Sequence, residues 1–359
     1  MAKIDQFLKA LVQKGGSDLH LTTGASPIAR VHGNMNPLPC RELTAGEVQS
    51  LLFEIMEDRW REIFQKKMDF DFAYEIPGVS RFRVNVFMQK KGMGGVFRTI
   101  PTEILTADQL GLPESIRNLA RLSKGLVLVT GPTGSGKSTT LAAIIDLINE
   151  TRNDHILTIE DPIEFTHPNK KCLVNQREVG TNTESFAASL RAALREDPDV
   201  ILVGEMRDKE TIELGMTAAE TGHLVFGTLH TNSAAKTVDR IIDVFPPEQQ
   251  PQIRSMLAES LRAVVSQVLL KKKGGKGRVA ALEILLGTSA LSNLIREGKV
   301  HQIPSVIQTG KGKGMQMLDQ HLMEHLMEGT IEAREAYTKA NNKEQFVSYL
   351  EDEEAEEVA

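Results

Sequence analysis

The segment that most constrains the fold of this chain is LVLVTGPTGSGKS, from Leu126 to Ser138. Four apolar, strand-favouring residues lead into glycines with the spacing G-x-x-x-x-G-K-S, and a helical pattern follows at 139–148. Glycines at these positions allow successive backbone N–H groups to turn towards an anion, and a helix beginning near Lys137 adds the positive end of its dipole. The segment therefore predicts a phosphate-binding loop between a buried strand and a helix, which is a site for a nucleoside triphosphate.

Two side chains complete the expected chemistry of this loop. Lys137 is expected to reach the β- and γ-phosphates of ATP, and the Ser138 hydroxyl is expected to ligate Mg²⁺. The residues expected to bind the nucleotide here are Gly131, Pro132, Thr133, Gly134, Ser135, Gly136, Lys137, Ser138 and Thr139.

Acidic residues end two further strand-like segments. From residue 115 onward helical patterns alternate with apolar strands, which predicts a parallel α/β sheet whose ligands lie at the carboxyl ends of the strands. Four acids fall at such ends, where the attacking water and Mg²⁺ are expected to bind: Glu160, Asp161, Glu164 and Glu205. The alternative is that they are solvated loop acids. The segment ending at Glu205 resembles a Walker B strand in which Gly204 replaces the usual aspartate. Glu205 is therefore expected to reach the metal, directly or through water.

Two histidines, His223 and His230, flank another apolar strand. At the rise of an extended strand they lie roughly 23 Å apart and on opposite faces. We therefore expect separate polar contacts to phosphate, to a carboxylate or to a neighbouring subunit, and no shared metal ion.

The first hundred residues have a different pattern, in which short strands are divided by glycine and proline. Helices are expected at 4–12 and 44–67, the second opened by a Thr44–Glu47 capping box, with a β-meander at 17–38 and strands at 70–74, 80–87 and 94–100. This predicts a mixed α+β domain over residues 1–100, a linker at 101–114 and an α/β domain at 115–359.

Three arginines of the first domain are candidate phosphate contacts. Arg81 and Arg83 are two apart on one expected strand and so share a face, and Arg98 lies on the next strand. They are candidates to neutralise the phosphate oxygens of a nucleotide held elsewhere. The alternative is a solvated strand face with scattered ion pairs.

The chain beyond residue 232 is expected to be mostly helical. Helices are expected at 234–242, 247–270, 288–298 and 315–328, with a strand at 279–286 after a basic hairpin loop at 271–278. The last of these helices has an apolar stripe that is typical of a core-facing helix. Its members are Met317, Leu318, Leu322, Leu326 and Met327.

Charge and cysteine content exclude several classes of function. The formal charge is −6, but six acids lie in the last nine residues, and the rest of the chain balances 42 bases against 42 acids. A chain with balanced charge has no overall positive surface for nucleic acid. The acidic tail at 351–359 is expected to be disordered. Cys40 and Cys172 are too few for a disulfide framework or a four-cysteine zinc site. Without a membrane-spanning run or signal peptide, the expected location is cytoplasmic, or peripheral on the cytoplasmic side of a membrane.

Four motifs in order make the chain similar to a known family. They are the phosphate loop at 131–138, TIEDPIEF at 158–165, LVGEMRD at 202–208 and AAETGHLVFGTLHT at 218–231, and NLIREGK at 293–299 adds to them. Over about residues 4–346 the chain resembles the secretion-type ATPase superfamily, and closely the PilT-type retraction ATPases of type IV pili.

The resemblance implies a PAS-like N-terminal domain, a RecA-like ATPase domain and a homohexamer that hydrolyses ATP with Mg²⁺. It implies that Glu164 is the general base with Glu160 in support, counts Glu205, His223 and His230 with the catalytic residues, and adds the three arginines to the nucleotide pocket. It further implies a motor for pilus retraction and twitching motility that works on an inner-membrane platform protein at the pilus base, with no nucleic acid.

One departure from the family leaves two alternatives open. The family stretch AIRNLIRE reads ALSNLIRE at 290–297, with Ser292 in place of the arginine. The chain could therefore be a paralogue, or a secretion ATPase, that is not the principal retraction motor. A hexameric nucleic-acid translocase built on the same RecA-like core is the alternative from another class.

Overall fold

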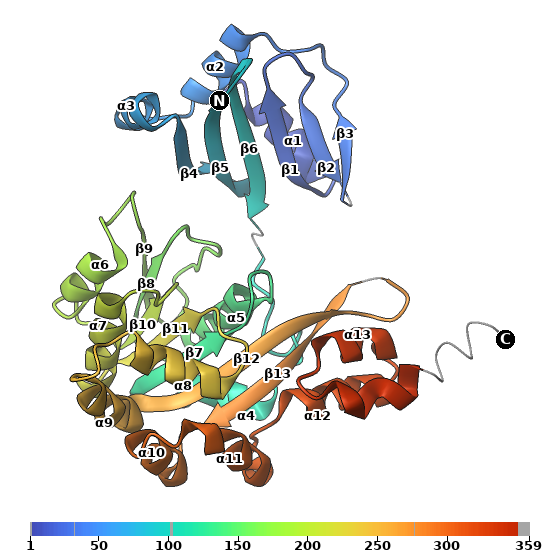
Figure 1. Cartoon of the computed structure of the whole chain (residues 1–359). Helices are drawn as coiled ribbons and strands as arrows, with labels where there is room; N and C mark the ends of the chain where they lie inside the picture. Colours follow the sequence, from blue (N-terminus) through green and yellow to red (C-terminus); the bar gives the residue numbers. More distant parts are fainter. Residues whose placement is uncertain (1, 32, 101–102, 276, 351–359) are drawn as a thin grey trace. The chain divides into compact units, whose positions relative to one another are not determined.

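The computed structural model describes residues 2–31, 33–100, 103–275 and 277–350, which form two compact units, seen in Figure 1. The first unit comprises residues 1–103 with 164–166, and the second comprises residues 104–163 and 167–359. In the expected linker range, Ala107 and Leu112 are buried in the core of the second unit. The acidic tail expected at 351–359 lies outside the described residues.

The first unit is a six-stranded antiparallel sheet covered by helices. The strand order is β3-β2-β1-β6-β5-β4, and every neighbouring pair is antiparallel. The strands are β1 Gly16–Thr22, β2 Ile28–Val31, β3 Asn34–Pro37, β4 Asp69–Ile76, β5 Ser80–Gln89 and β6 Gly92–Ile100. Helices α1 Asp5–Gln13, α2 Ala45–Phe53 and α3 Asp58–Lys67 share one hydrophobic core with the sheet. The expected α+β domain and its meander are confirmed.

The expected helix at 44–67 is wrong in one respect, because it is two helices. The Thr44–Glu47 capping box is present at the start of α2. The helix ends after Phe53, whose carbonyl accepts hydrogen bonds from both Nε and Nη2 of Arg61 on α3. Met56, between the helices, is buried in the core. The arginine thus satisfies a helix-terminal carbonyl that would otherwise lack a partner.

The second unit is built on a seven-stranded sheet with the order β13-β12-β7-β11-β10-β8-β9. All neighbouring strands are parallel except β13, which pairs antiparallel with β12 at one edge. The strands are β7 Gly125–Thr130, β8 His155–Glu160, β9 Leu173–Glu178, β10 Val200–Val203, β11 Leu224–Leu229, β12 Leu261–Lys271 and β13 Arg278–Leu286. This is the parallel α/β sheet expected from the sequence.

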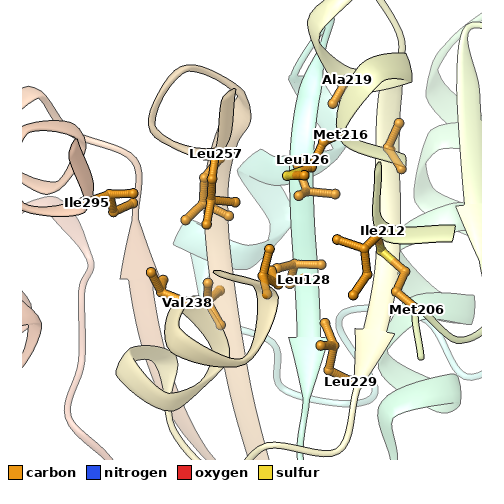
Figure 2. Close-up of a cluster of buried hydrophobic side chains, with 14 of the residues drawn as sticks. Leu126, Leu128, Met206, Ile212, Met216, Ala219, Leu229, Val238, Leu257 and Ile295 are labelled. Carbon is orange, nitrogen blue, oxygen red and sulfur yellow. The ribbon is translucent and has the colours of Figure 1, made fainter. Parts of the chain in front are cut away.

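Helices cover both faces of this sheet. Alternate residues of β7 point to opposite faces: Leu126 and Leu128 belong to one core, shown in Figure 2, and Val127 and Val129 to the other. The first core includes residues of α6 Phe186–Ala193, α7 Lys209–Glu220, α8 Ala234–Asp243, α9 Gln250–Ser260, α10 Ser289–Arg296 and α11 Ile303–Thr309. The second includes residues of α4 Glu114–Arg117 and α5 Lys137–Thr151.

The expected helix at 247–270 is wrong over its second half. Helix α9 ends at Ser260, and β12 follows directly as an inner strand between β7 and β13. A continuous apolar run of this kind fits a buried strand as well as a buried helix, and here pairing on both sides makes it a strand.

The C-terminal helices pack on the β12–β13 hairpin. Helix α12 Leu318–Met327 and α13 Ala333–Lys339 share a small core with Leu270 and Ala281. Within the expected apolar stripe, Leu318 and Leu322 are buried, but Met327 is 59% exposed and lies outside the core. Among the described residues, no helix combines the length and apolar character needed to cross a membrane.

Candidate nucleotide-binding site

The predicted phosphate loop joins β7 to α5 at the carboxyl edge of the sheet. Gly131, Gly134 and Gly136 have φ values of 143°, 77° and 88°, a region of backbone conformation that favours glycine. Helix α5 begins at Lys137, so its N-terminus faces the loop. The strand, loop and helix therefore have the order and backbone geometry that an anion nest requires.

The loop encloses its lysine. Lys137 is 9% exposed, and its Nζ donates hydrogen bonds to the carbonyl oxygens of Gly131 (2.9 Å) and Pro132 (3.2 Å). Ser135 is buried, and its Oγ has no hydrogen-bond partner among the residues that the structure describes. A buried hydroxyl of this kind is suited to a ligand oxygen. Ser138 and Thr139 are half-buried in the first turn of α5.

A residue that the sequence did not single out supports the loop from β12. The carboxamide of Gln267 donates from Nε2 to the carbonyl oxygen of Ser135 (2.7 Å) and accepts at Oε1 from the hydroxyl of Thr140 (2.8 Å). Its neighbour Ser266 is hydrogen-bonded through its hydroxyl to that of Thr130, at 2.8 Å. A single glutamine in an apolar run gives no motif, so only the pairing of β12 with β7 reveals this contact.

Glu160 ends β8 and is held by polar neighbours. Its Oε1 accepts hydrogen bonds from Thr158 Oγ1 (2.6 Å) and from Gln176 Nε2 (3.2 Å) on β9. The backbone N–H of Ile163 donates to the buried carboxylate of Glu178, also on β9, at 3.0 Å. Two side chains of β9 thus hold the acidic segment, and neither was predicted from the sequence.

Asp161 and Glu164 are exposed. Glu164 belongs to the short segment 164–166 that is grouped with the first unit, and it directly follows Ile163. Glu178 therefore fixes the backbone directly before Glu164.

The glycine that replaces the usual Walker B aspartate lies against β8. A Cβ atom added to Gly204 would lie 3.1 Å from the carbonyl oxygen of Ile159 and 3.2 Å from Cα of Glu160. Glycine thus lets the end of β10 approach the end of β8 closely.

Glu205 follows this glycine and joins two basic side chains. Its Oε1 lies 2.9 Å from Nε2 of His230, at the end of β11, and also accepts from Nε of Arg207. This carboxylate raises the pKa of Arg207 above its usual value through the hydrogen bond and its charge. His230 therefore makes one of the polar contacts expected for it, the contact to a carboxylate.

His223 lies at the opposite end of β11 and contacts the backbone. Its Nδ1 lies 3.0 Å from the carbonyl oxygen of Ala218. His223 and His230 thus flank opposite ends of β11 and make separate contacts. Among the described residues, no three His, Cys, Asp or Glu side chains cluster to form a metal site.

The three candidate arginines share the outer face of the first unit's sheet. Arg83 lies directly opposite Arg98, while the alternating residues Phe82, Val84 and Phe97 are buried on the other face. Acidic side chains lie close to Arg98 and Arg83. Arg98 Nε donates to Asp18 Oδ1 at 2.9 Å, and Arg83 Nε lies 4.0 Å from Asp71 Oδ1. Arg81 precedes Arg83 by two residues on β5 and is half-buried.

Asp18 shows the electrostatic effect of this arginine face. Burial by itself would raise the pKa of Asp18, but hydrogen bonds from Arg98 and Ser17 outweigh it and lower the pKa below its usual value. The aspartate is therefore a stable anion that neutralises part of the positive charge.

The second unit thus gathers a loop of inward-turning backbone, a lysine and carboxylates at one edge of a parallel sheet. A hydroxyl from Ser138 and a carboxylate from Glu205 are oxygen donors of the kind that Mg²⁺ takes together with phosphate oxygens and water. A Mg²⁺ ion held by these two residues would neutralise charge on the β- and γ-phosphates of a bound nucleotide.

Comparisons with known proteins agree with this geometry. Residues 1–345 match the type II/IV secretion system protein family. The type IV pilus retraction ATPase PilT of Pseudomonas aeruginosa is 56% identical over 343 residues, covering 96% of this chain and 99% of the relative. A twitching motility protein of Neisseria gonorrhoeae is 56% identical over 319 residues, covering 89% and 85% of the two chains. The crystal structure of the pilus retraction motor PilT with bound ADP superposes with a TM-score of 0.90 at 47% identity, covering 96% of this chain and 99% of that one.

Proposed function

The chain belongs to the type II/IV secretion system protein family, among its PilT-type ATPases, and we propose that it retracts type IV pili by hydrolysing ATP. The observation that carries this proposal is the enclosed loop in which Lys137 is held by Gly131 and Pro132, beside strand ends that bear Glu160 and Glu205. The likeness to PilT supports the pilus as the load.

The roles of the residues follow from their positions. The loop N–H groups and Lys137 bind the β- and γ-phosphates, and Ser138 and Glu205 hold Mg²⁺. Glu164 takes the proton of the attacking water, with Glu160 as its support. His230 orients Glu205 through the contact at 2.9 Å.

The working form that we propose is a homohexamer on the cytoplasmic face of the inner membrane, in contact with the pilus platform protein. Arg81, Arg83 and Arg98 contribute positive charge to a nucleotide pocket in this assembly. At the position of the family arginine, the Ser292 hydroxyl donates to the carbonyl oxygen of Ala258 at 2.7 Å and ties α10 to α9.

Lys137→Ala tests the nucleotide site. Turnover should be lost and ATP binding weakened, because the variant removes the lysine that neutralises the β- and γ-phosphates. ATP hydrolysis and binding of a fluorescent ATP analogue measure the two effects. Lys171→Ala, which removes an exposed lysine of the same unit, should leave both unchanged. Hydrolysis by Lys137→Ala at the wild-type rate would overturn the site assignment.

The same assay separates the pilus motor from the translocase. Adding single-stranded DNA should leave the rate of ATP hydrolysis unchanged for a pilus motor, whereas a translocase should respond. Expression of the protein in a strain that lacks its own retraction ATPase then tests whether it retracts pili, because a pilus motor should restore twitching.

A further inference from the structure

Gln267 on β12 is a buried carboxamide whose two polar atoms are both used by the nucleotide segment. It is 3% exposed. Its Nε2 donates to the carbonyl oxygen of Ser135 in the loop, and its Oε1 accepts from Thr140 in the first turns of α5. One side chain therefore connects the loop to the helix that follows it.

The glycines of the loop approach the same residue. A Cβ atom added to Gly131 would lie 2.2 Å from the backbone oxygen of Gln267, and one added to Gly136 would lie 2.8 Å from its Nε2. The first and last glycines of the loop are thus packed against Gln267, and no other residue type fits at either position without displacing it.

Gln267 is itself fixed by the sheet. On one side of it, Ser266 lies opposite Thr130 of β7, and the two hydroxyls are hydrogen-bonded. On the other side, Gln267 lies opposite Leu282 of β13. The carboxamide therefore projects from a rigid inner strand at the point where β7 ends.

We propose that Gln267 is a positioning residue that holds the phosphate loop in its binding shape before a nucleotide arrives. In a trans peptide the C=O and the following N–H point in opposite directions. Because Gln267 draws the Ser135 carbonyl towards β12, the N–H of Gly136 points away from β12, to the side where the phosphates bind. A loop ordered in advance loses less conformational freedom on binding, and a glycine-rich loop would otherwise lose much.

This inference rests on the proposed nucleotide site, and ADP affinity in the presence of Mg²⁺ tests it. Gln267→Met keeps the length of the side chain and removes both hydrogen bonds, so it should weaken ADP binding by about tenfold or more. Thr140→Val removes one of the two bonds and should have a smaller effect. The KM for ATP should rise in both variants by a larger factor than kcat falls.

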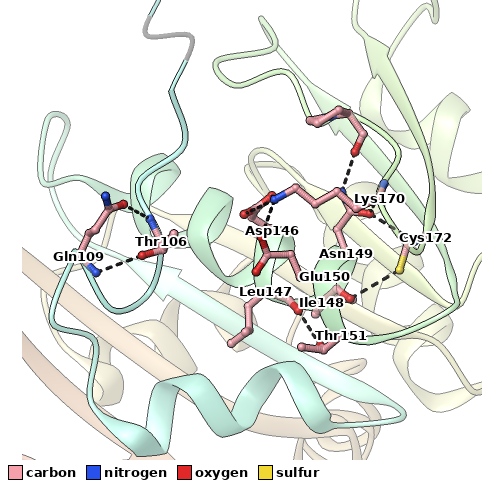
Figure 3. Close-up of polar contacts among 11 residues, drawn as sticks. Thr106, Gln109, Asp146, Leu147, Ile148, Asn149, Glu150, Thr151, Lys170 and Cys172 are labelled. Carbon is pink, nitrogen blue, oxygen red and sulfur yellow. Dashed lines mark hydrogen bonds and ion pairs between the residues drawn. The ribbon is translucent and has the colours of Figure 1, made fainter.

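Asn149, at the other end of α5, provides a matched control. It is also a fully buried carboxamide, and it donates to Pro168 O (2.7 Å) and accepts from the N–H groups of Lys170 (3.1 Å) and Cys172 (3.3 Å), as Figure 3 shows in part. Asn149→Leu should lower thermal stability and leave ADP affinity near the wild-type value. If it weakens ADP binding as much as Gln267→Met does, the effect is general destabilisation and the proposal is wrong.

Gln267→Glu should make ADP affinity depend on pH, which a purely structural role of Gln267 would not do. The ionised carboxylate still accepts from Thr140 but cannot donate to Ser135 O, whereas the protonated acid can do both. Burial raises the pKa of a carboxyl group, so ADP affinity of this variant should recover as the pH is lowered from 8 to 6, and that of Gln267→Met should not. If Gln267→Met does not fold, Thr140→Val and Gln267→Glu carry the test, and unchanged ADP affinity in both would overturn the proposal. Failure of the wild-type protein to bind ADP would instead overturn the nucleotide site.

Discussion

Glu160 and Glu164 lie four residues apart, and their surroundings suit different tasks. The carboxylate of Glu160 is half-buried and fixed by Thr158 and Gln176. Glu164 is exposed and follows a backbone N–H that Glu178 holds. A carboxylate fixed by two donors is suited to orient other groups, while an exposed one is accessible to a water molecule that must lose its proton. This contrast favours Glu164 as the base.

Replacing each acid by its amide separates these roles. Glu164→Gln should retain the nucleotide and lower kcat by about two orders of magnitude, as expected for the loss of a general base. Glu160→Gln should lower kcat less, because the amide keeps an acceptor for Thr158. Single-turnover hydrolysis and nucleotide binding provide the measurements. An active Glu164→Gln beside an inactive Glu160→Gln would assign the base to Glu160.

At this scale the sequence predicts residues that belong to motifs and misses those that act singly. The loop glycines and Lys137 are found from their spacing, because anion binding dictates that spacing. Gln176, Glu178 and Gln267 are strand residues that belong to no motif, and their targets lie at the ends of neighbouring strands or in the loops that follow them. Only the strand order brings them to the site.

Helices and strands were predicted correctly where the local sequence pattern agreed with the tertiary structure. The capping box at Thr44 marks a helix start because its hydrogen bonds are local. The end of α2 and the strand β12 depend on distant partners: Arg61 on the Phe53 carbonyl in one case, and β7 and β13 in the other. Neither break is marked by glycine or proline, so periodicity alone extended both helices too far.

Helix α12 carries an acid-sensitive contact with β13. His321 stacks on His325 with ring centroids 4.4 Å apart, and its Nδ1 accepts a hydrogen bond from the backbone N–H of Leu282 at 3.0 Å. Burial, and then the charge of His325, lower the pKa of His321 from 6.5 to about 4. The folded state therefore requires a neutral imidazole.

The sign of the pH dependence follows from this shift. Between pH 6.5 and about 4 the unfolded state binds the proton of His321 more readily than the folded state does, so the free energy of unfolding falls as the pH decreases through this range. Urea unfolding at pH 7.5 and pH 5 should show His321→Gln losing less stability than the wild type, by on the order of 1–2 kcal/mol. The exposed His301→Gln is the control and should keep the wild-type pH dependence. If all three proteins lose the same unfolding free energy between pH 7.5 and pH 5, His321 is not the source of the pH dependence.

The whole molecule carries its candidate phosphate contacts on two separate units. The loop, Glu160 and Glu205 belong to the second unit, and the arginine face belongs to the first. Arginines that stabilise charge developing during phosphoryl transfer often come from a neighbouring subunit. The proposed hexamer would supply such a neighbour for every nucleotide, and ATP hydrolysis per chain should then fall steeply on dilution below the assembly constant.

Mixing two inactive variants decides whether the arginines serve another copy of the chain. Arg83→Ala leaves the base intact, and Glu164→Gln leaves the arginine intact, so each variant alone should have little ATPase activity. In mixed rings, an interface that combines the base of one chain with the arginine of its neighbour is complete, and an equal mixture should recover about a quarter of the wild-type rate. Lys66→Ala in place of Arg83→Ala controls for changes in assembly, because Lys66 is an exposed cation on α3, away from the arginine face. If rings verified as mixed recover no activity at any ratio, the arginines act within their own chain or outside the site.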